Sequence, residues 1–253
     1  MTTLLVPELQ RYLTRRVTWI TGLVAASLFG VIALFAGAQS SGPRVRLSDF
    51  GPSMIVLAVM LVSAWSFFTA ASAIGSEQSS GALGTWLTFN PRRWPVFTAK
   101  LLSVTLPAAV AGLAALLVAF GWSLLISSYS PPSAVVGMFG MVIRGTLVVV
   151  SIAALGFVLA VITRSTLGAL GVLVGWLVLF VFQVAITSMM GAYSQWIGLE
   201  RALAEFLLNQ EYVRYGEIHS NPWVVGGAGL IWFAFVAAVV IFAGWLFARR
   251  DVD

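Results

Sequence analysis

Apolar residues along this chain gather into long runs, and polar residues are confined to the stretches between them. Each run is long enough to cross a membrane as a helix, which takes about 20 mainly apolar residues. Membrane-spanning β-strands would instead be about ten residues long with alternating polarity. The pattern therefore predicts an all-α polytopic membrane protein with six transmembrane helices. The predicted spans are roughly Val17–Ala38, Pro52–Ile74, Leu101–Ser127, Ala134–Ile162, Leu167–Met189 and Trp223–Ala248.

Composition points the same way. Of the 253 residues, 60% are hydrophobic and only 9% are charged, whereas soluble domains are about 25% charged. The mean hydropathy is +0.98. Because apolar runs occupy nearly the whole sequence, residues 1–253 are expected to form a single transmembrane domain.

Lysine and arginine near the span ends predict the orientation, because cytoplasmic loops of membrane proteins are enriched in them. Placing the N-terminus inside assigns nine of these residues to cytoplasmic segments and four to outer loops. Both termini are therefore expected on the cytoplasmic side of the cell membrane. The nine are Arg11, Arg15, Arg16, Arg92, Arg93, Lys100, Arg164, Arg249 and Arg250, and the four are Arg44, Arg46, Arg201 and Arg214.

Several chemistries are excluded by residue counts. The chain has no cysteine, so thiolate metal sites and cysteine nucleophiles are absent. The single histidine, His219, cannot form a His-rich metal site, and the single lysine, Lys100, is not part of a phosphate-binding loop. Catalytic and metal-ligating residues are therefore not predicted, and the chain is not expected to be an enzyme by itself. The net charge is +5, but the basic residues flank the spans and form no stripe along one face. Nucleic acid is therefore not an expected partner.

The first sixteen residues predict an amphipathic helix. Leu5, Leu9 and Tyr12 fall on one face, and Glu8 and Arg11 fall on another. Such a helix would lie at the cytoplasmic interface, in contact with membrane lipid. The alternative is a basic flank that only sets the topology.

The connection Gly75–Lys100 is longer than a turn requires, and long loops commonly carry function. A short helix is predicted from about Glu77 to Phe89, ending before Pro91 because a residue preceding proline avoids the helical region. One reading is a helix that docks into a partner, and the other is a helix lying on lipid with its arginines at head groups. The apolar positions of this helix are Leu83, Trp86, Leu87 and Phe89.

Two further features have a structural and a functional reading. Arg144 is the only charge inside an apolar run, so it either lines or gates a pathway or extends toward the outer face. One reading of Gln183 and Thr187, together with Ser63, Ser66, Thr69 and Ser72, is a polar path. The other is that the small hydroxyls bond neighbouring helices or their own backbone. The segment 190–222 is expected to form short outer helices, because apolar residues recur there at helical spacing. These residues are Trp196, Leu199, Leu203, Phe206 and Leu207.

The layout of spans, N-terminal helix and second cytoplasmic loop resembles the membrane subunits of type-two ABC exporters. Members of that family commonly carry a glutamate after span two, a Gly-Thr-Leu stretch, a Pro-x-x-Arg-like turn and a Gly-Lys pair opening span three. Ala82 replaces the threonine of this pattern, and Ala99 replaces the glycine. The matching residues are Glu77, Gly81, Leu83, Pro91, Arg93 and Lys100, and the chain ends in a family-like Phe247-Ala248-Arg249-Arg250-Asp251-Val252.

The resemblance implies a permease that forms half of a translocation pathway. It would pair with a second copy or a closely similar permease, and two separate ABC ATPase subunits would dock beneath. No cofactor is then expected in this chain, since ATP and Mg²⁺ would bind to the ATPase. The alternative is a membrane anchor or assembly protein that binds a cytoplasmic partner without moving solute. The residues implied in coupling to the ATPase are Glu77, Gly81, Leu83, Trp86, Leu87, Pro91, Arg92 and Arg93.

Overall fold

The computed structural model describes residues 2–39, 47–82, 93–127, 131–190, 203, 206–207 and 222–249. Within these ranges the chain forms seven helices, which confirms the all-α prediction. The helices are α1 (Thr2–Leu13), α2 (Arg16–Gln39), α3 (Leu47–Ser79), α5 (Arg93–Ile126), α6 (Pro132–Thr163), α7 (Thr166–Met190) and α9 (Pro222–Arg249).

Five of these helices, α2, α3, α5, α6 and α9, are long and apolar enough to cross a membrane. The protein is therefore a polytopic membrane protein. The predicted fifth span corresponds to α7, in which Thr166–Val178 forms a shorter apolar stretch. The count of six spans remains a prediction.

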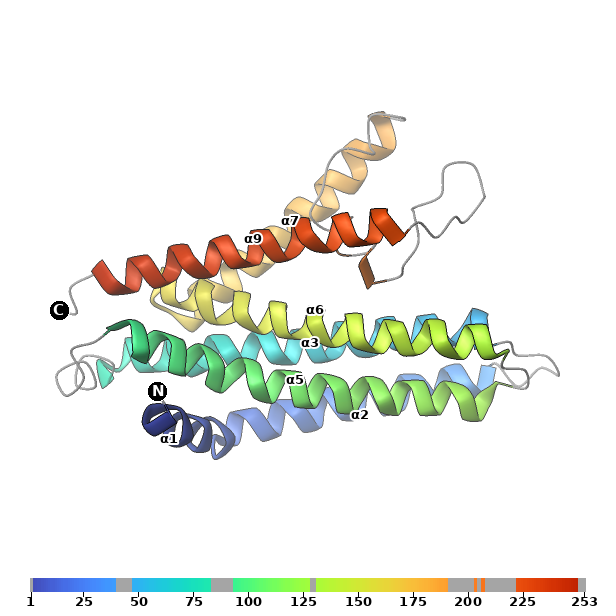
Figure 1. Cartoon of the computed structure of the whole chain (residues 1–253), viewed down its shortest axis with the longest axis horizontal. Helices are drawn as coiled ribbons and strands as arrows, with labels where there is room; N and C mark the ends of the chain where they lie inside the picture. The colour runs from blue at the N-terminus through green and yellow to red at the C-terminus, as the bar shows by residue number, and fades with distance from the viewer. Residues whose placement is uncertain are drawn as a thin grey trace.

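The long helices run back and forth along a common direction (Figure 1). α6 ends at the same end of the bundle as α1, while α9 begins at the opposite end (Figure 1). The chain must therefore travel the length of the bundle between Thr163 and Pro222, and α7 starts this return. α7 also diverges from the other helices as it rises (Figure 1).

α3 and α6 form the centre of the bundle and make its most extensive helix contact. In each of them 61% of the most apolar stretch is buried, compared with 6% in α2. Gly156 of α6 permits the close approach, because a Cβ atom there would lie 2.5 Å from the carbonyl oxygen of Phe67. Small residues allow such backbone contact between membrane helices.

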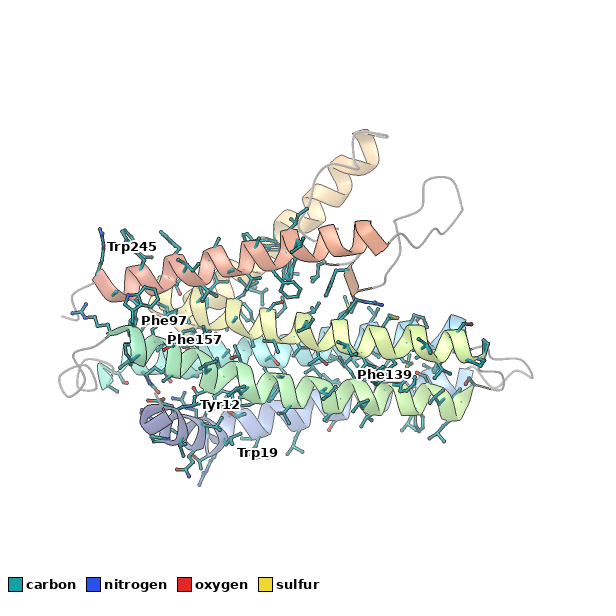
Figure 2. The ribbon with its side chains drawn as sticks, in the orientation of Figure 1. Tyr12, Trp19, Phe97, Phe139, Phe157 and Trp245 are labelled. Carbon is teal, nitrogen blue, oxygen red and sulfur yellow. The ribbon has the colours of Figure 1, made fainter. Side chains whose placement is uncertain are left out.

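Aromatic side chains join α5, α6 and α9 near the α1 end (Figure 2). The ring of Phe97 lies 5.5 Å from that of Phe157 and 5.7 Å from that of Phe247. These are separations at which aromatic pairs stabilise packing beyond the area they bury. The start of α5 and the C-terminal parts of α6 and α9 are thereby held together near the α1 end.

Two helices extend farther than the apolar pattern predicts. α3 continues past Ile74 to Ser79, and α5 begins at Arg93, before Leu101. The expected loop Gly75–Lys100 is correspondingly shorter, and the predicted helix does not begin at Glu77, which lies in the last turn of α3. The apolar criterion ended the spans at charged residues, but those charges are neutralised inside the bundle.

Candidate functional site

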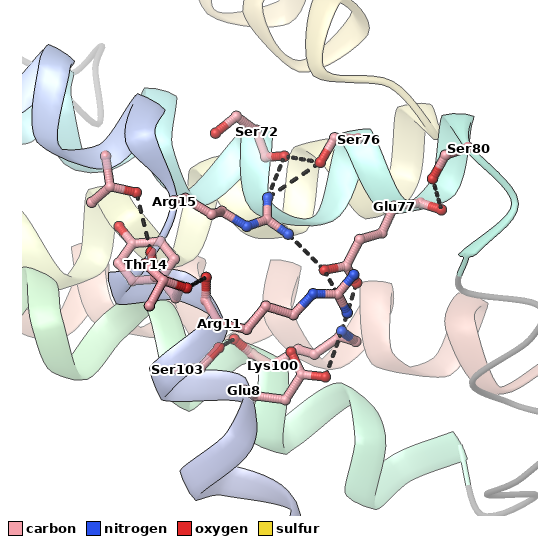
Figure 3. A network of polar contacts seen from close by, with 12 residues as sticks. Glu8, Arg11, Thr14, Arg15, Ser72, Ser76, Glu77, Ser80, Lys100 and Ser103 are labelled. Carbon is pink, nitrogen blue, oxygen red and sulfur yellow. Dashed lines mark hydrogen bonds and ion pairs between the residues drawn. The ribbon is translucent and has the colours of Figure 1, made fainter.

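A buried ionic cluster lies at the α1 end of the bundle (Figure 3). It joins three helices that are distant in sequence, namely α1, α3 and α5. We define the cluster by its five charged residues, Glu8, Arg11, Arg15, Glu77 and Lys100.

Glu77 is the acceptor at the centre of this ionic cluster. Its Oε2 atom accepts a hydrogen bond from Lys100 Nζ at 2.6 Å, and its Oε1 atom accepts one from Arg15 Nη2 at 2.7 Å. Arg11 Nη1 lies farther from Oε1, at 3.4 Å. With the residue only 5% exposed, Glu77 is directed into the bundle and away from the surrounding medium.

Lys100 bridges the two carboxylates of the cluster. Besides Glu77, its Nζ atom donates to Glu8 Oε1 at 2.9 Å. Lys100 is 4% exposed and Glu8 is 7% exposed, so α1 presents its acidic residue to α5 and not to solvent. The sequence pattern placed Glu8 on the polar face of the first helix, and the structure buries it there because the Lys100 ammonium group compensates its charge.

Polar groups of α3 complete the attachment of α1. Arg15 Nη1 donates to the Ser72 carbonyl oxygen and to Ser76 Oγ, each at 3.2 Å. The Tyr12 hydroxyl donates to Thr69 Oγ1 at 2.9 Å. Burial raises the pKa of Tyr12 above its usual value, so the hydroxyl stays protonated and available as a donor.

The balance of the ionic cluster is positive, with three basic side chains and two acidic ones. Buried charges are tolerated when they are paired and hydrogen-bonded, and removing one partner is strongly destabilising. The cluster therefore selects one seating of α1 against the bundle. The charged groups of the cluster pair with one another and thereby position α1 against α3 and α5.

The implied coupling residues are only partly described. Glu77 lies in the ionic cluster, and Gly81 follows α3 with a φ of 72°, a left-handed conformation that favours glycine. Arg93 opens α5 and donates from Nη1 to the carbonyl oxygen of Ala248 near the end of α9, at 3.4 Å. The remaining coupling residues, Leu83, Trp86, Leu87, Pro91 and Arg92, lie outside the described residues.

The two candidate pathway residues are not brought together with this cluster. Arg144 lies in α6 and donates from Nε to the carbonyl oxygen of Leu207, at 3.4 Å. It thus contacts the segment that precedes α9. Gln183 lies in α7, and its side chain is outside the described part of the chain.

Described residues of the segment before α9 fold back onto the bundle. Leu207 is buried with residues of α3, α5 and α6, and the Phe206 ring packs edge-on against Phe233 of α9 at 5.3 Å. Leu203 packs against the same cores. The helical spacing of these apolar residues therefore reflects packing against the helices.

Sequence reasoning placed Glu77 and Lys100 in one loop but did not pair them, and it left Glu8 out of the site. One signal was available: Glu8, Glu77 and Lys100 are isolated charges beside apolar runs predicted at one membrane face. Their contact still depends on how α1 folds back after Leu13, which a linear pattern does not specify. The sequence matches no protein-family model and no curated protein.

Proposed function

We propose that this protein is the permease subunit of an ATP-driven ABC exporter, forming half of a translocation pathway and coupling to a separate ATPase subunit. The proposal combines the family-like pattern of residues 77–100 with the position of that segment in the bundle. The α1 end would face the cytoplasm, and the membrane would be the cell membrane.

Charge supports this orientation. Seven of the nine basic residues predicted to be cytoplasmic are described by the structure. They lie in α1 or near the helix termini that Figure 1 draws at the α1 end. Enrichment of lysine and arginine at one end is typical of the cytoplasmic side. The seven are Arg11, Arg15, Arg16, Arg93, Lys100, Arg164 and Arg249.

The observation that carries the proposal is the buried ion pair of Glu77 with Lys100. Glu77 lies on α3 and Lys100 lies on α5, the helices that precede and follow residues 83–92. Each also pairs with a residue of α1, Glu77 with Arg11 and Lys100 with Glu8. Arg93, at the start of α5, connects α9 to this group of helices through its hydrogen bond to the Ala248 carbonyl oxygen. A partner bound at the loop would therefore act on four helices that are already joined by charged or polar contacts.

Nucleotide chemistry belongs to the partner in this proposal. The only lysine is Lys100, and its ammonium group is engaged by two carboxylates, so it is not available to hold phosphate. ATP and Mg²⁺ would bind to two ATPase subunits. A second permease copy, or a closely similar permease, would supply the other half of the pathway.

The test is reconstitution of the full chain in lipid with a Walker-motif ATPase encoded beside it. We expect the two proteins to co-purify and the permease to stimulate ATP turnover. Co-purification without stimulation of turnover would favour the alternative, a membrane anchor for a cytoplasmic partner. Failure of every adjacent ATPase to bind would overturn the exporter proposal.

A further inference from the structure

A long apolar groove runs between α2, α3 and α5 and ends beside the ionic cluster. Its volume is about 850 Å³, within the roughly 300–1,000 Å³ typical of small-molecule sites. Two tryptophan side chains that line the groove connect α2 to α3 and to α5. Trp65 Nε1 donates to the Thr18 carbonyl oxygen at 3.1 Å, and Trp122 Nε1 donates to the Ala33 carbonyl oxygen at 3.3 Å.

The space between these two tryptophans is long and narrow. Thr18 and Ala33 are separated by about 22 Å of helix at 1.5 Å per residue. Small residues make the hollow, including Gly22 and Gly30 of α2 and Ala111 of α5. An extended hydrocarbon chain is thin enough to lie along a hollow bordered by such small residues.

The groove opens sideways along its length. Leu23, Leu34, Val110 and Val118 line it, and each is more than 60% exposed. α2 is also the least buried of the five long apolar helices. In a membrane this opening faces the acyl chains, so a chain can enter laterally without displacing a polar group.

One end of the groove is positively charged. Tyr12 lines both the groove and the hollow around the ionic cluster, in which basic residues outnumber acidic ones. Arg11 retains 41% exposure of its side chain, and the exposed Arg16 begins α2 just before Thr18. Arginine binds phosphate through charge-assisted hydrogen bonds, and basic residues next to a membrane attract anionic lipids.

We propose that this groove binds an anionic phospholipid, with a hydrocarbon chain between α2 and α5 and the phosphate at Arg11 and Arg16. Apolar lining, lateral opening and positive charge at one end match the three parts of such a molecule. The site is independent of the exporter assignment, since it requires only insertion in a membrane.

The experiment is native mass spectrometry of the detergent-solubilised full chain with added phosphatidylglycerol or phosphatidylcholine of identical acyl chains. We expect tighter binding of phosphatidylglycerol. Arg16→Gln should weaken its binding about fivefold, the effect of one basic residue at an anionic surface, and leave phosphatidylcholine unchanged.

A groove-filling variant tests the chain site separately. No atom lies within 4 Å of a Cβ built at Gly30, so Gly30→Leu should fold normally, occupy the groove and weaken binding of both lipids. The matched controls are Gly171→Leu, whose Cβ also meets open space, and Arg249→Gln on α9; both should bind lipid like the parent. Parental thermal unfolding of Gly30→Leu would establish that its fold is intact.

Equal binding of the two lipids by the parent, or parental lipid binding by a folded Gly30→Leu variant, would overturn the proposal. Conversion of a dimer to a monomer by Gly30→Leu, with lipid binding unchanged, would also overturn it and identify the groove as a contact between copies.

Discussion

The carboxylate of Glu77 lies 2.6 Å from the ammonium group of Lys100. Glu77 is on α3, the helix before the connecting loop, and Lys100 is on α5, the helix after it. Both residues are at most 5% exposed. The pair therefore joins the end of α3 to the start of α5 within the bundle. Glu8 and Arg11 attach α1 to the pair, and Arg15 attaches the turn between α1 and α2.

Lys100→Met should destabilise the protein by about 3–5 kcal/mol, because removing one partner leaves buried charge without compensation. The measurement is thermal or denaturant unfolding in detergent. Arg11→Gln is the matched control: Arg11 is 41% exposed and 3.4 Å from Glu77, so its loss should change stability by less than about 1 kcal/mol. Equal stability of the Lys100→Met variant and the parent would contradict the importance of this pairing.

Gly156→Ala should destabilise the central contact between α3 and α6. The added Cβ would lie 2.5 Å from the Phe67 carbonyl oxygen, and such overpacking costs about 1–3 kcal/mol. Gly137→Ala on the same helix meets no atom within 4 Å and should be neutral or slightly stabilising. A comparison of the two unfolding temperatures checks this, and similar values would argue against the close approach.

Single cysteines test the proposed orientation cleanly because the natural chain has none. Cysteine at Ser41, Ser130 or Ser194 should react with an impermeant maleimide added outside intact cells. Cysteine at Ser79 or Val252 should react only after the membrane is permeabilised. Labelling of Ser79→Cys from outside would reverse the orientation derived from the basic residues.

Trp86→Ala should weaken association with the proposed ATPase by about 2 kcal/mol or more, since aromatic anchors dominate protein interfaces. Co-purification of the ATPase and its turnover in lipid are the readouts. Trp19→Ala is the control, because Trp19 is 63% exposed on α2 and belongs to no part of the loop. Parental association and turnover with Trp86→Ala would reject Trp86 as a coupling anchor.

Glu77→Gln is expected to behave differently from Trp86→Ala. Glu77 is buried in the ionic cluster, so neutralising it should loosen the seating of α1 without removing contact area from a docked ATPase. We expect lower stability and reduced stimulation of ATP turnover, with association retained. Loss of ATPase binding at parental stability would instead indicate direct contact between Glu77 and the partner.

Helix positions were predictable from the apolar pattern because hydrocarbon-length runs leave few alternatives. The observed α2 and α6 each begin and end within about two residues of the predicted spans. The extensions of α3 and α5 were not predictable, since Glu77 and Lys100 count as interruptions until their pairing is known. Nor could periodicity place Glu8 toward the bundle, because a carboxylate is buried only where a partner compensates its charge, and that partner, Lys100, lies 92 positions away in sequence.

The lengths of α3, α5 and α6, at 33, 34 and 32 residues, have a mechanical consequence. At 1.5 Å per residue each is about 48–51 Å long, whereas the hydrocarbon core is about 30 Å thick. Even at a steep tilt of about 40°, each would still project beyond the core. Glu77, the member of the ionic cluster in the final turn of α3, would thus lie on the part of that helix outside the hydrocarbon. Because α3 is one continuous helix, a force applied to its part outside the hydrocarbon would tilt the part inside the membrane as well.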